Sequence, residues 1–268
     1  MGRNHVLTFF WVFLTGLLSS GQTTESQKGA FDKLRAESWQ QVFFDDGSED
    51  WQEQWSLDGL RGMVKNTKEG MVFSAGPIRG DNGSHNVLWT KSSFEGDIKI
   101  EFDYTRLDDI SYAVNILYIQ ATGIGEYPYV ADIMQWANLR EVPYMNRYFR
   151  HMNLLHISYA AYPLKEGSNP DYVRARRYPV RPGQSFGKDT RLSPDYENTG
   201  LFQPGVGYHF ICIKKGDQLF LQVSNDEVAR LFAWDTSTFE SITEGRVGIR
   251  HMYTRAARYA NVSISVLD

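Results

Sequence analysis

Alternation of hydrophobic and polar residues predicts short β-strands along most of this chain. The stretch 153–162 carries the alternation that matters most. A period of two predicts that one face of this strand consists of Leu155, Ile157 and Tyr159. The opposite face would then carry His156, Ser158 and Ala160. A half-exposed strand with a surface histidine is the simpler alternative.

Other segments have the same strand character. The stretch 97–104 alternates cleanly, with apolar residues predicted inward at Ile98, Ile100, Phe102 and Tyr104. Val114 to Ala121 is apolar on both faces, as in a central strand. No long amphipathic helix is evident, and roughly twelve short strands are counted. The pattern predicts an all-β, antiparallel two-sheet β-sandwich in which less than about a tenth of the residues are helical.

The N-terminal residues predict export, and the rest of the chain has the length of a single domain. Residues 1–21 combine Arg3, an apolar run and small residues, which is typical of a secretory signal peptide. We therefore expect a periplasmic or secreted protein. Residues 22–40 are polar and predict an N-terminal tether with at most a helical turn, and residues 41–268 suit one sandwich domain. The single cysteine, Cys212, excludes an internal disulfide and is expected in the core.

Charge and motifs exclude several functions. The net charge of −4 gives no reason to expect a nucleic-acid or membrane partner. Phosphate-binding loops, nucleophile elbows and zinc-protease motifs are absent, and the histidines lack ligand spacing. We therefore expect no cofactor and no metal, with a structural calcium held by loop aspartates left as an alternative. The paired carboxylates of a jelly-roll glycosidase are also missing from the strands.

The polar residues that interrupt apolar strands suggest a site for an acidic ligand. Arginine beside histidine and tyrosine suits a carboxylate or sulfate group. The candidates are His85, His156, Tyr159, Arg174, Arg176 and Arg250. A solvated basic face is the alternative for the arginines of residues 174–177. The long aromatic connection from Gly123 to Met152 adds Trp136 and Tyr144 as candidate ligand contacts, although it could instead only pack its aromatic residues on the sandwich edge.

Four segments resemble a known family. They are Gly83–Trp89, Phe94–Glu101, Leu155–Tyr159 and Gly245–Met252. Together they are similar to the YesU-like proteins, bacterial concanavalin-like jelly rolls that are often found among enzymes degrading rhamnose- and uronate-containing polysaccharides. One branch resembles ulvan oligosaccharide dehydratases. The resemblance covers about residues 42–266, and the long Gly123–Met152 insertion departs from it.

The resemblance and the residues together predict a carbon–oxygen lyase acting on a uronic-acid-containing oligosaccharide. We expect His156 to act as base or acid, with His85 or Tyr159 as its partner. The expected substrate-binding residues are Arg250, Arg174, Arg176, Ser158, Trp136 and Tyr144. Alternation puts Tyr159 on the face opposite His156, so a β-bulge would be needed to bring the two together. A non-catalytic carbohydrate-binding jelly roll and a structural jelly roll remain the competing interpretations.

The expected geometry is specific. His156, Ser158 and Arg250 should project into one concave cleft, roofed in part by the connection from Gly123 to Met152. The reason is that these polar residues lie opposite apolar strand faces, and that the aromatic residues of the connection need a surface to cover. No oligomeric state is predicted.

Overall fold

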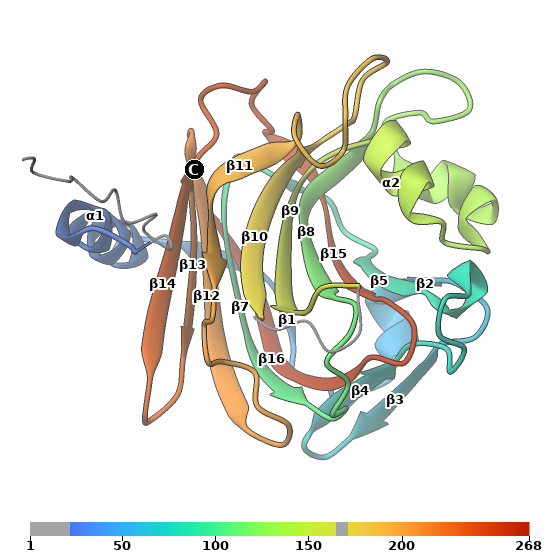
Figure 1. Cartoon of the computed structure of the whole chain (residues 1–268), viewed down its shortest axis with the longest axis horizontal. Coiled ribbons are helices and arrows are strands. Elements are labelled where there is room, and N and C mark those ends of the chain that lie inside the picture. The colour runs from blue at the N-terminus through green and yellow to red at the C-terminus, as the bar shows by residue number, and fades with distance from the viewer. Residues whose placement is uncertain (1–21, 165–170, 268) are drawn as a thin grey trace, which may run out of the picture.

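The computed structural model describes residues 22–164 and 171–267, and in this part of the chain two antiparallel sheets pack face to face (Figure 1). The prediction of an all-β two-sheet sandwich is confirmed, with sixteen strands instead of about twelve. The two α-helices span 11 and 7 residues, so α-helix stays below a tenth of the described residues. The predicted signal peptide, residues 1–21, lies outside the described residues.

Sheet A contains the strands that open and close the described chain. Its hydrogen-bonded order is β14-β13-β12-β7-β16-β4-β3, and β1 also pairs with β16. The strands are β1 (Gln40–Asp45), β3 (Met63–Thr67), β4 (Gly70–Ser74), β7 (Asp97–Arg106), β12 (Gly207–Lys215), β13 (Gln218–Ser224), β14 (Ala229–Asp235) and β16 (Ala256–Leu267). The last strand, β16, therefore lies in the middle of this sheet.

Sheet B carries most of the candidate residues. Its order is β11-β10-β9-β8-β15-β5-β2, and β6 pairs with β15. The strands are β2 (Trp55–Asp58), β5 (Asn86–Thr90), β6 (Phe94–Glu95), β8 (Asn115–Gly123), β9 (Met152–Ala161), β10 (Tyr172–Tyr178), β11 (Arg191–Glu197) and β15 (Glu244–His251). Strand β8 is central, as its two apolar faces predict.

The main core lies between the sheets and follows the predicted alternation. Every second residue of β7 is buried, including Ile98, Ile100, Phe102 and Tyr104. Leu155 and Ile157 of β9 face them from sheet B, and Cys212 of β12 lies in the same core with a free, buried thiol. Burial of these apolar side chains is the dominant favourable term for such a fold.

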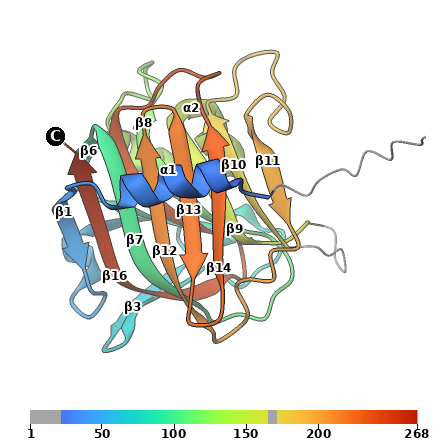
Figure 2. The same cartoon turned by 90° about the vertical axis from the view of Figure 1, so that its left-hand side faces the viewer.

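The N-terminal segment is not the loose tether that the polar sequence predicts. Helix α1 (Glu25–Arg35) begins with a capping box between Thr24 and Gln27. It buries Phe31 and Leu34 on the outer face of sheet A, where it lies across β12, β13 and β14 (Figure 2). The sequence prediction was wrong because the few apolar residues of α1 would not stabilise an isolated helix of this length. The outer face of sheet A provides the apolar surface that stabilises it.

A second layer covers the outer face of sheet B. We call residues 124–151 the roof segment; it contains the 3₁₀-helix η3 (Ile133–Arg140) and helix α2 (Met145–His151). Its Trp136 and Tyr148 are buried against residues of sheet B. Two further 3₁₀-helices are η1 (Trp51–Glu53) and η2 (Asn82–Ser84). The predicted covering of the site strands by the aromatic connection is therefore observed, with helical turns in place of an irregular loop.

A buried carboxylate fixes the roof segment to the sheet. Asp58 Oδ2 accepts hydrogen bonds from Trp89 Nε1 at 2.7 Å, Arg140 Nε at 2.5 Å and the Tyr148 hydroxyl at 2.9 Å. Arg140 also donates to the Ile133 carbonyl at 2.7 Å and is fully buried. Two roof residues thus share one acceptor from β2, which sets the position of η3 and α2 over the sheet.

Candidate functional site

Strand pairing aligns several candidate residues across the outer face of sheet B. In the register of β10, β9, β8 and β15, Arg174 pairs with Ser158, Ser158 with Ile116, and Ile116 with Arg250. Residues that pair directly across antiparallel strands point to the same face. Ser158 and Arg250 therefore lie on one face with Arg174, two strands apart from each other.

A second row, two residues along each strand, contains the histidine. Arg176 pairs with His156, His156 with Tyr118, and Tyr118 with Gly248. The indole ring of Trp89 covers Gly248 so closely that a Cβ there would lie 2.4 Å from the ring, which explains the glycine. The structure thus places His156, Ser158 and Arg250 on one face, as the alternation predicts.

His156 is held between two hydroxyl groups. Its Nδ1 lies 2.6 Å from the Tyr178 hydroxyl, and its Nε2 lies 2.6 Å from Ser158 Oγ. Burial, followed by the charges of Arg176, Arg250 and Arg174, lowers the pKa of His156 well below its usual value. The ring is therefore neutral at pH 7. A neutral imidazole has one N–H and one lone pair, so one hydroxyl accepts a hydrogen bond and the other donates.

Arg250 is buried, and none of the acidic side chains that the structure describes pairs with it. Its Nη2 donates to His85 Nδ1 at 2.7 Å and to the Pro143 carbonyl at 2.5 Å, and its guanidinium lies 4.5 Å from the centre of the Tyr148 ring. Its Nε and Nη1 make no hydrogen bond to any described residue, although Arg250 is fully buried. A buried cation with unsatisfied N–H groups is costly, and a bound anion would satisfy them.

The bond from Arg250 fixes the tautomer of His85. Arginine only donates, so His85 Nδ1 accepts and the proton of the neutral ring lies on Nε2. Burial and the charge of Arg250 lower the pKa of His85 to about 2. In the part of the chain that the structure describes, the Nε2 of His85 has no hydrogen-bond partner. His85 is thus arranged as a neutral hydrogen-bond donor, which differs from the acid or base role that the sequence suggests.

Two tyrosine hydroxyl groups also belong to the site around His156 and Arg250. Tyr118 is fully buried between the His156 and Arg250 strands, and its hydroxyl has no hydrogen-bond partner within residues 22–164 and 171–267. Burial raises the pKa of Tyr118 to about 12, against the opposing effect of Arg250. Tyr178 is bonded to His156 as described, and burial raises its pKa well above 10. Both phenols are therefore neutral donors at pH 7.

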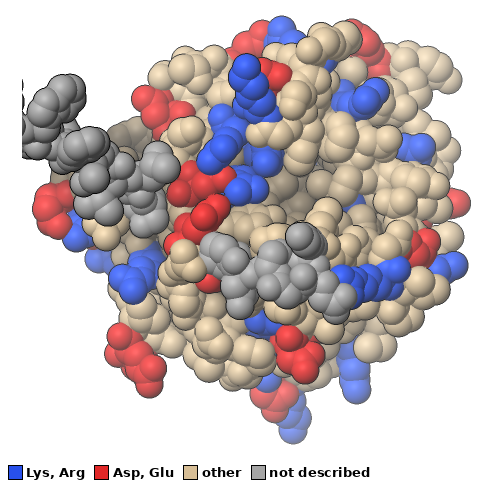
Figure 3. Space-filling view, in the orientation of Figure 1, with Lys and Arg blue, Asp and Glu red and all other residues tan. Residues whose placement is uncertain are grey.

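The two arginines of β10 already have partners. Arg174 forms an ion pair with Asp195 and lies over the Tyr172 ring. Arg176 donates to the Phe186 carbonyl at 2.8 Å and to Thr190 Oγ1 at 3.2 Å. The positive charges of both arginines help to lower the pKa of His156, but most of their contacts shown here are with other protein groups. Figure 3 shows Lys and Arg side chains gathered beside a hollow near the middle of the view.

Tyr159 lies away from this group, and its assignment as a partner of His156 is corrected. It is buried in the core between the sheets, where its hydroxyl lies 2.6 Å from that of Tyr259. A β-bulge does occur in β9, but at Ala160, whose φ is +42°. The bulge follows Tyr159, so it turns Ala160 to the core side and leaves Tyr159 there as well.

The aromatic candidates of the roof segment differ from each other. Trp136 is 1% exposed and donates from Nε1 to the Val130 carbonyl at 3.0 Å, so it packs the roof instead of presenting a surface. Tyr144 is 43% exposed and adjoins Pro143, whose carbonyl accepts from Arg250. Of the two, Tyr144 is the one positioned to contact a ligand.

Sequence reasoning missed Tyr118 and Tyr178 as site residues. Alternation from Arg174 and Arg176 along β10 placed Tyr178 on the arginine face, which was a usable signal. Tyr118 was concealed in a strand that is apolar on both faces. Within residues 22–164 and 171–267, no group of three His, Cys, Asp or Glu side chains could hold a metal ion. Across the same ranges, none of the helices has the length and apolar character needed to cross a membrane.

Comparison with known proteins shows the fold. The structure is similar to a Bacillus subtilis protein of unknown function with a galectin-like fold, at 16% identity and a TM-score of 0.62, covering 86% of this chain and 100% of that one. A legume lectin-like domain from Entamoeba histolytica matches at 6% identity and a TM-score of 0.57, covering 87% and 100% of the two chains.

The exoplasmic/lumenal domain of VIP36, in a form with bound Ca²⁺ and Man3GlcNAc, matches at 9% identity and a TM-score of 0.55, covering 86% and 91% of the two chains. No protein-family model and no curated protein matches the sequence. The chain is a lectin-like jelly roll.

Proposed function

We propose that the protein is a lyase that eliminates water or a sugar from a uronic-acid-containing oligosaccharide on the outer face of sheet B. One observation carries the proposal. Neutral His156, bonded to two hydroxyls, lies on the same face as Arg250, a buried cation that has unsatisfied N–H groups and no carboxylate partner among the described residues. A uronate brings both the missing anion and a weakly acidic C–H bond.

Arg250 would stabilise the charge that develops in this reaction. The carbon next to the uronate carboxylate loses its proton, and negative charge spreads onto the carboxylate. A guanidinium bonded to that group stabilises the enolate-like state more than the ground state. The substrate carboxylate would take the place of the Pro143 carbonyl as an acceptor for Arg250, so the roof segment has to shift when substrate binds.

His156 and Tyr178 would move the protons. His156 takes the proton from carbon, and the electron pair forms a C=C bond as the bond to the leaving oxygen breaks. The leaving oxygen receives a proton from the Tyr178 hydroxyl, 2.6 Å from His156, and departs as water or a sugar hydroxyl. Proton transfer from His156 then restores Tyr178. His85 donates a hydrogen bond from Nε2 and takes no proton.

The test is turnover of uronate-containing oligosaccharides by the purified protein, read by ultraviolet absorbance of the unsaturated product and by mass. His156→Ala should lower the rate by about 10²–10⁴-fold, the contribution of one general acid or base. His209→Ala is the matched control, since His209 is an exposed histidine paired with Asp103 on sheet A. No product from any uronate, or unchanged turnover in folded His156→Ala, rejects the proposal.

Binding without catalysis is the second candidate, and exposed Tyr144 beside the Arg250 contact favours it. The similar VIP36 domain was solved with a bound oligosaccharide, which supports a sugar ligand for this fold. In this case Tyr144→Ala would weaken oligosaccharide binding, whereas His156→Ala would have little effect and no product would form.

We also propose that the protein is exported and related to the YesU-like family. Support for export comes from the composition of residues 1–21, and support for the relationship comes from the four segments named above together with the shared galectin-like fold. Mass analysis of the protein from the periplasm or medium should give a chain that begins near residue 22. An uncleaved cytoplasmic chain rejects the export proposal.

A further inference from the structure

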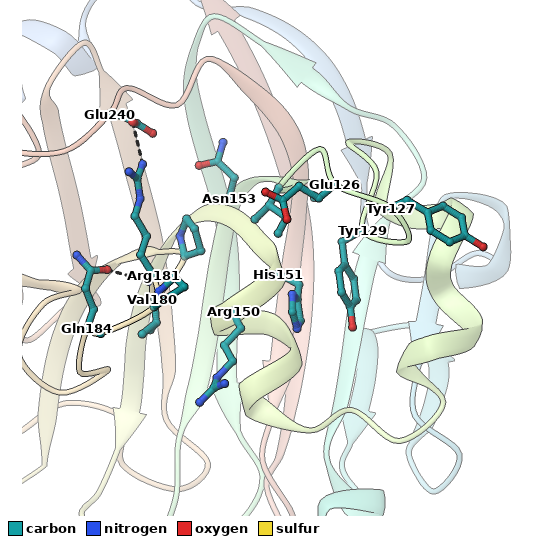
Figure 4. A pocket seen from close by; sticks show the side chains of 15 residues that line it. Glu126, Tyr127, Tyr129, Arg150, His151, Asn153, Val180, Arg181, Gln184 and Glu240 are labelled. Carbon is teal, nitrogen blue, oxygen red and sulfur yellow. Dashed lines mark hydrogen bonds and ion pairs between the residues drawn. The ribbon is translucent and has the colours of Figure 1, made fainter.

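A cleft of about 830 Å³ opens at one end of the sandwich, apart from the group around His156. One wall is the loop after β10, residues 179–184, together with Glu240 (Figure 4). The facing wall consists of the two ends of the roof segment, with Glu126 and Tyr129 from its start and His151 from its end. The volume lies within the range of about 300–1,000 Å³ that is usual for small-molecule sites.

Backbone hydrogen bonds hold both walls in place. Ile124 N donates to the His151 carbonyl at 3.2 Å, and Gly125 N donates to the Tyr129 carbonyl at 3.1 Å. On the other side, Val180 N donates to the Phe149 carbonyl at 2.6 Å. The Tyr129 and His151 rings stack with centroids 3.7 Å apart. The cleft is therefore preformed, which lowers the cost of ordering it around a ligand.

Packed aromatic rings separate the cleft from the outer-face group. Phe149 of α2 contacts Tyr178 and Phe186, with ring centroids 6.3 Å and 4.7 Å away. Phe186 in turn lies 6.0 Å from Tyr178. Among the described residues that line the cleft, none belongs to the group around His156, so the cleft is a second space.

The positive and negative side chains that line the cleft offset each other in charge. Arg150 and Arg181 face Glu126 and Glu240, and Arg181 is already paired with Glu240 at 2.8 Å. Burial, then Arg147 and Arg150, lower the pKa of His151, so its ring is neutral at pH 7. The outer face, in contrast, gathers Arg174, Arg176 and Arg250. Charge therefore favours a neutral ligand in the cleft.

The remaining lining residues match a ligand that is rich in hydroxyl groups. Asn153 has an amide that both donates and accepts, and Glu126 supplies further acceptors. The Gln184 oxygen accepts from Arg181 N, which leaves its amide N–H groups as donors. Apolar surface lies between them at Ile124 and Val180. Hydroxyl groups can satisfy both donors and acceptors, and the C–H faces of a sugar ring suit the apolar parts.

We infer that this cleft binds a short neutral oligosaccharide, at a site that does not depend on the uronate chemistry proposed for the outer face. In a mixed polysaccharide, neutral sugar units would occupy the cleft and acidic units the outer face. The inference goes beyond the proposed function and is tested without turnover.

The experiment measures binding of uncharged trisaccharides of glucose, xylose, mannose and rhamnose to the full chain, by calorimetry and ligand-observed NMR. A galacturonic acid trisaccharide serves as the charged comparison. The variant Arg181→Ala/Glu240→Ala removes an exposed ion pair without changing net charge. Asp32→Ala/Arg35→Ala is the matched control, because it removes an exposed pair from α1. Exposed pairs add little to stability, so both variants should fold.

We expect at least one neutral trisaccharide to bind and the Arg181→Ala/Glu240→Ala variant to bind it at least about tenfold more weakly, about 1.4 kcal/mol. The control variant and His156→Ala should bind it as the wild type does. The inference is overturned if no neutral trisaccharide binds, if the cleft variant binds normally, or if His156→Ala abolishes binding. Neutral binding without uronate turnover would reject the proposed lyase function alone.

Discussion

Replacing Asp58 by Asn tests how the roof segment is held over the outer face of sheet B. The change keeps the shape of the side chain and an acceptor for Trp89 and Tyr148. It removes the negative charge 2.5 Å from Arg140 Nε, in a pair whose side chains are 3% and 0% exposed. An uncompensated buried guanidinium remains. Breaking a buried ion pair in this way costs about 3–5 kcal/mol.

The double variant Asp58→Asn/Arg140→Met separates charge from packing. Methionine fills much of the volume of Arg140 without a charge, so stability should return to within about 1–2 kcal/mol of the wild type. Urea unfolding measures both values. In thermal unfolding, Asp58→Asn should lower Tm by about 6–20 °C, given about 2–4 °C per kcal/mol for a domain of this size.

Hydrogen exchange adds a local measure. Amides of η3 and α2 should lose protection in Asp58→Asn more than those of β7, which belongs to the core between the sheets. The reasoning is refuted if Asp58→Asn costs less than about 1 kcal/mol, or if the double variant is no more stable than the single one.

The remaining predictions concern the site, the N-terminal helix and pH. Arg250→Lys should keep the charge but lose the planar donor geometry, so uronate turnover should fall much more than Tm. Phe31→Ala should cost about 3–5 kcal/mol in urea unfolding, because Phe31 is 1% exposed between α1 and sheet A; an effect below about 1 kcal/mol would mean that α1 does not stabilise the sheet. The pKa values of His85, His156 and His251 are lowered in the folded state. The unfolded chain therefore binds more protons below pH 6.5, and stability should fall by up to about 2 kcal/mol per histidine between pH 6.5 and 5. Stability that is constant over this range would contradict the burial of neutral rings.

Local alternation predicted the faces of most of the candidate residues on β9. It placed His156 and Ser158 opposite Leu155 and Ile157, as the structure confirms. The prediction for Ala160 was wrong because a bulge changes the period by one residue, and alanine has no side-chain chemistry that signals a positive φ. Alternation therefore predicts faces only as far as the next bulge.

The alternation of hydrophobic and polar residues did not predict the contacts between strands. The bond between His156 and Tyr178 depends on the register of β9 and β10, and the bond between Asp58 and Arg140 joins residues 82 positions apart. Hydrophobic period carries no information on which strands become neighbours. The neutral donor role of His85 likewise follows only from the contact with Arg250. The candidate residues were recognisable by type, whereas their partners needed the fold.

The central position of β15 and β16 has a consequence for how the chain acquires its fold. β16 pairs with β1, β4 and β7, and β15 lies between β5 and β8. These two strands follow all the other described strands in the chain. Until they arrive, the early strands β1 to β5 have no hydrogen-bonded connection to β7 or β8 in either sheet. Assembly of the sandwich therefore has to wait for these two strands and, with pairings this distant in sequence, is expected to be slow. During that interval unpaired strand edges are exposed and open to chaperones or aggregation.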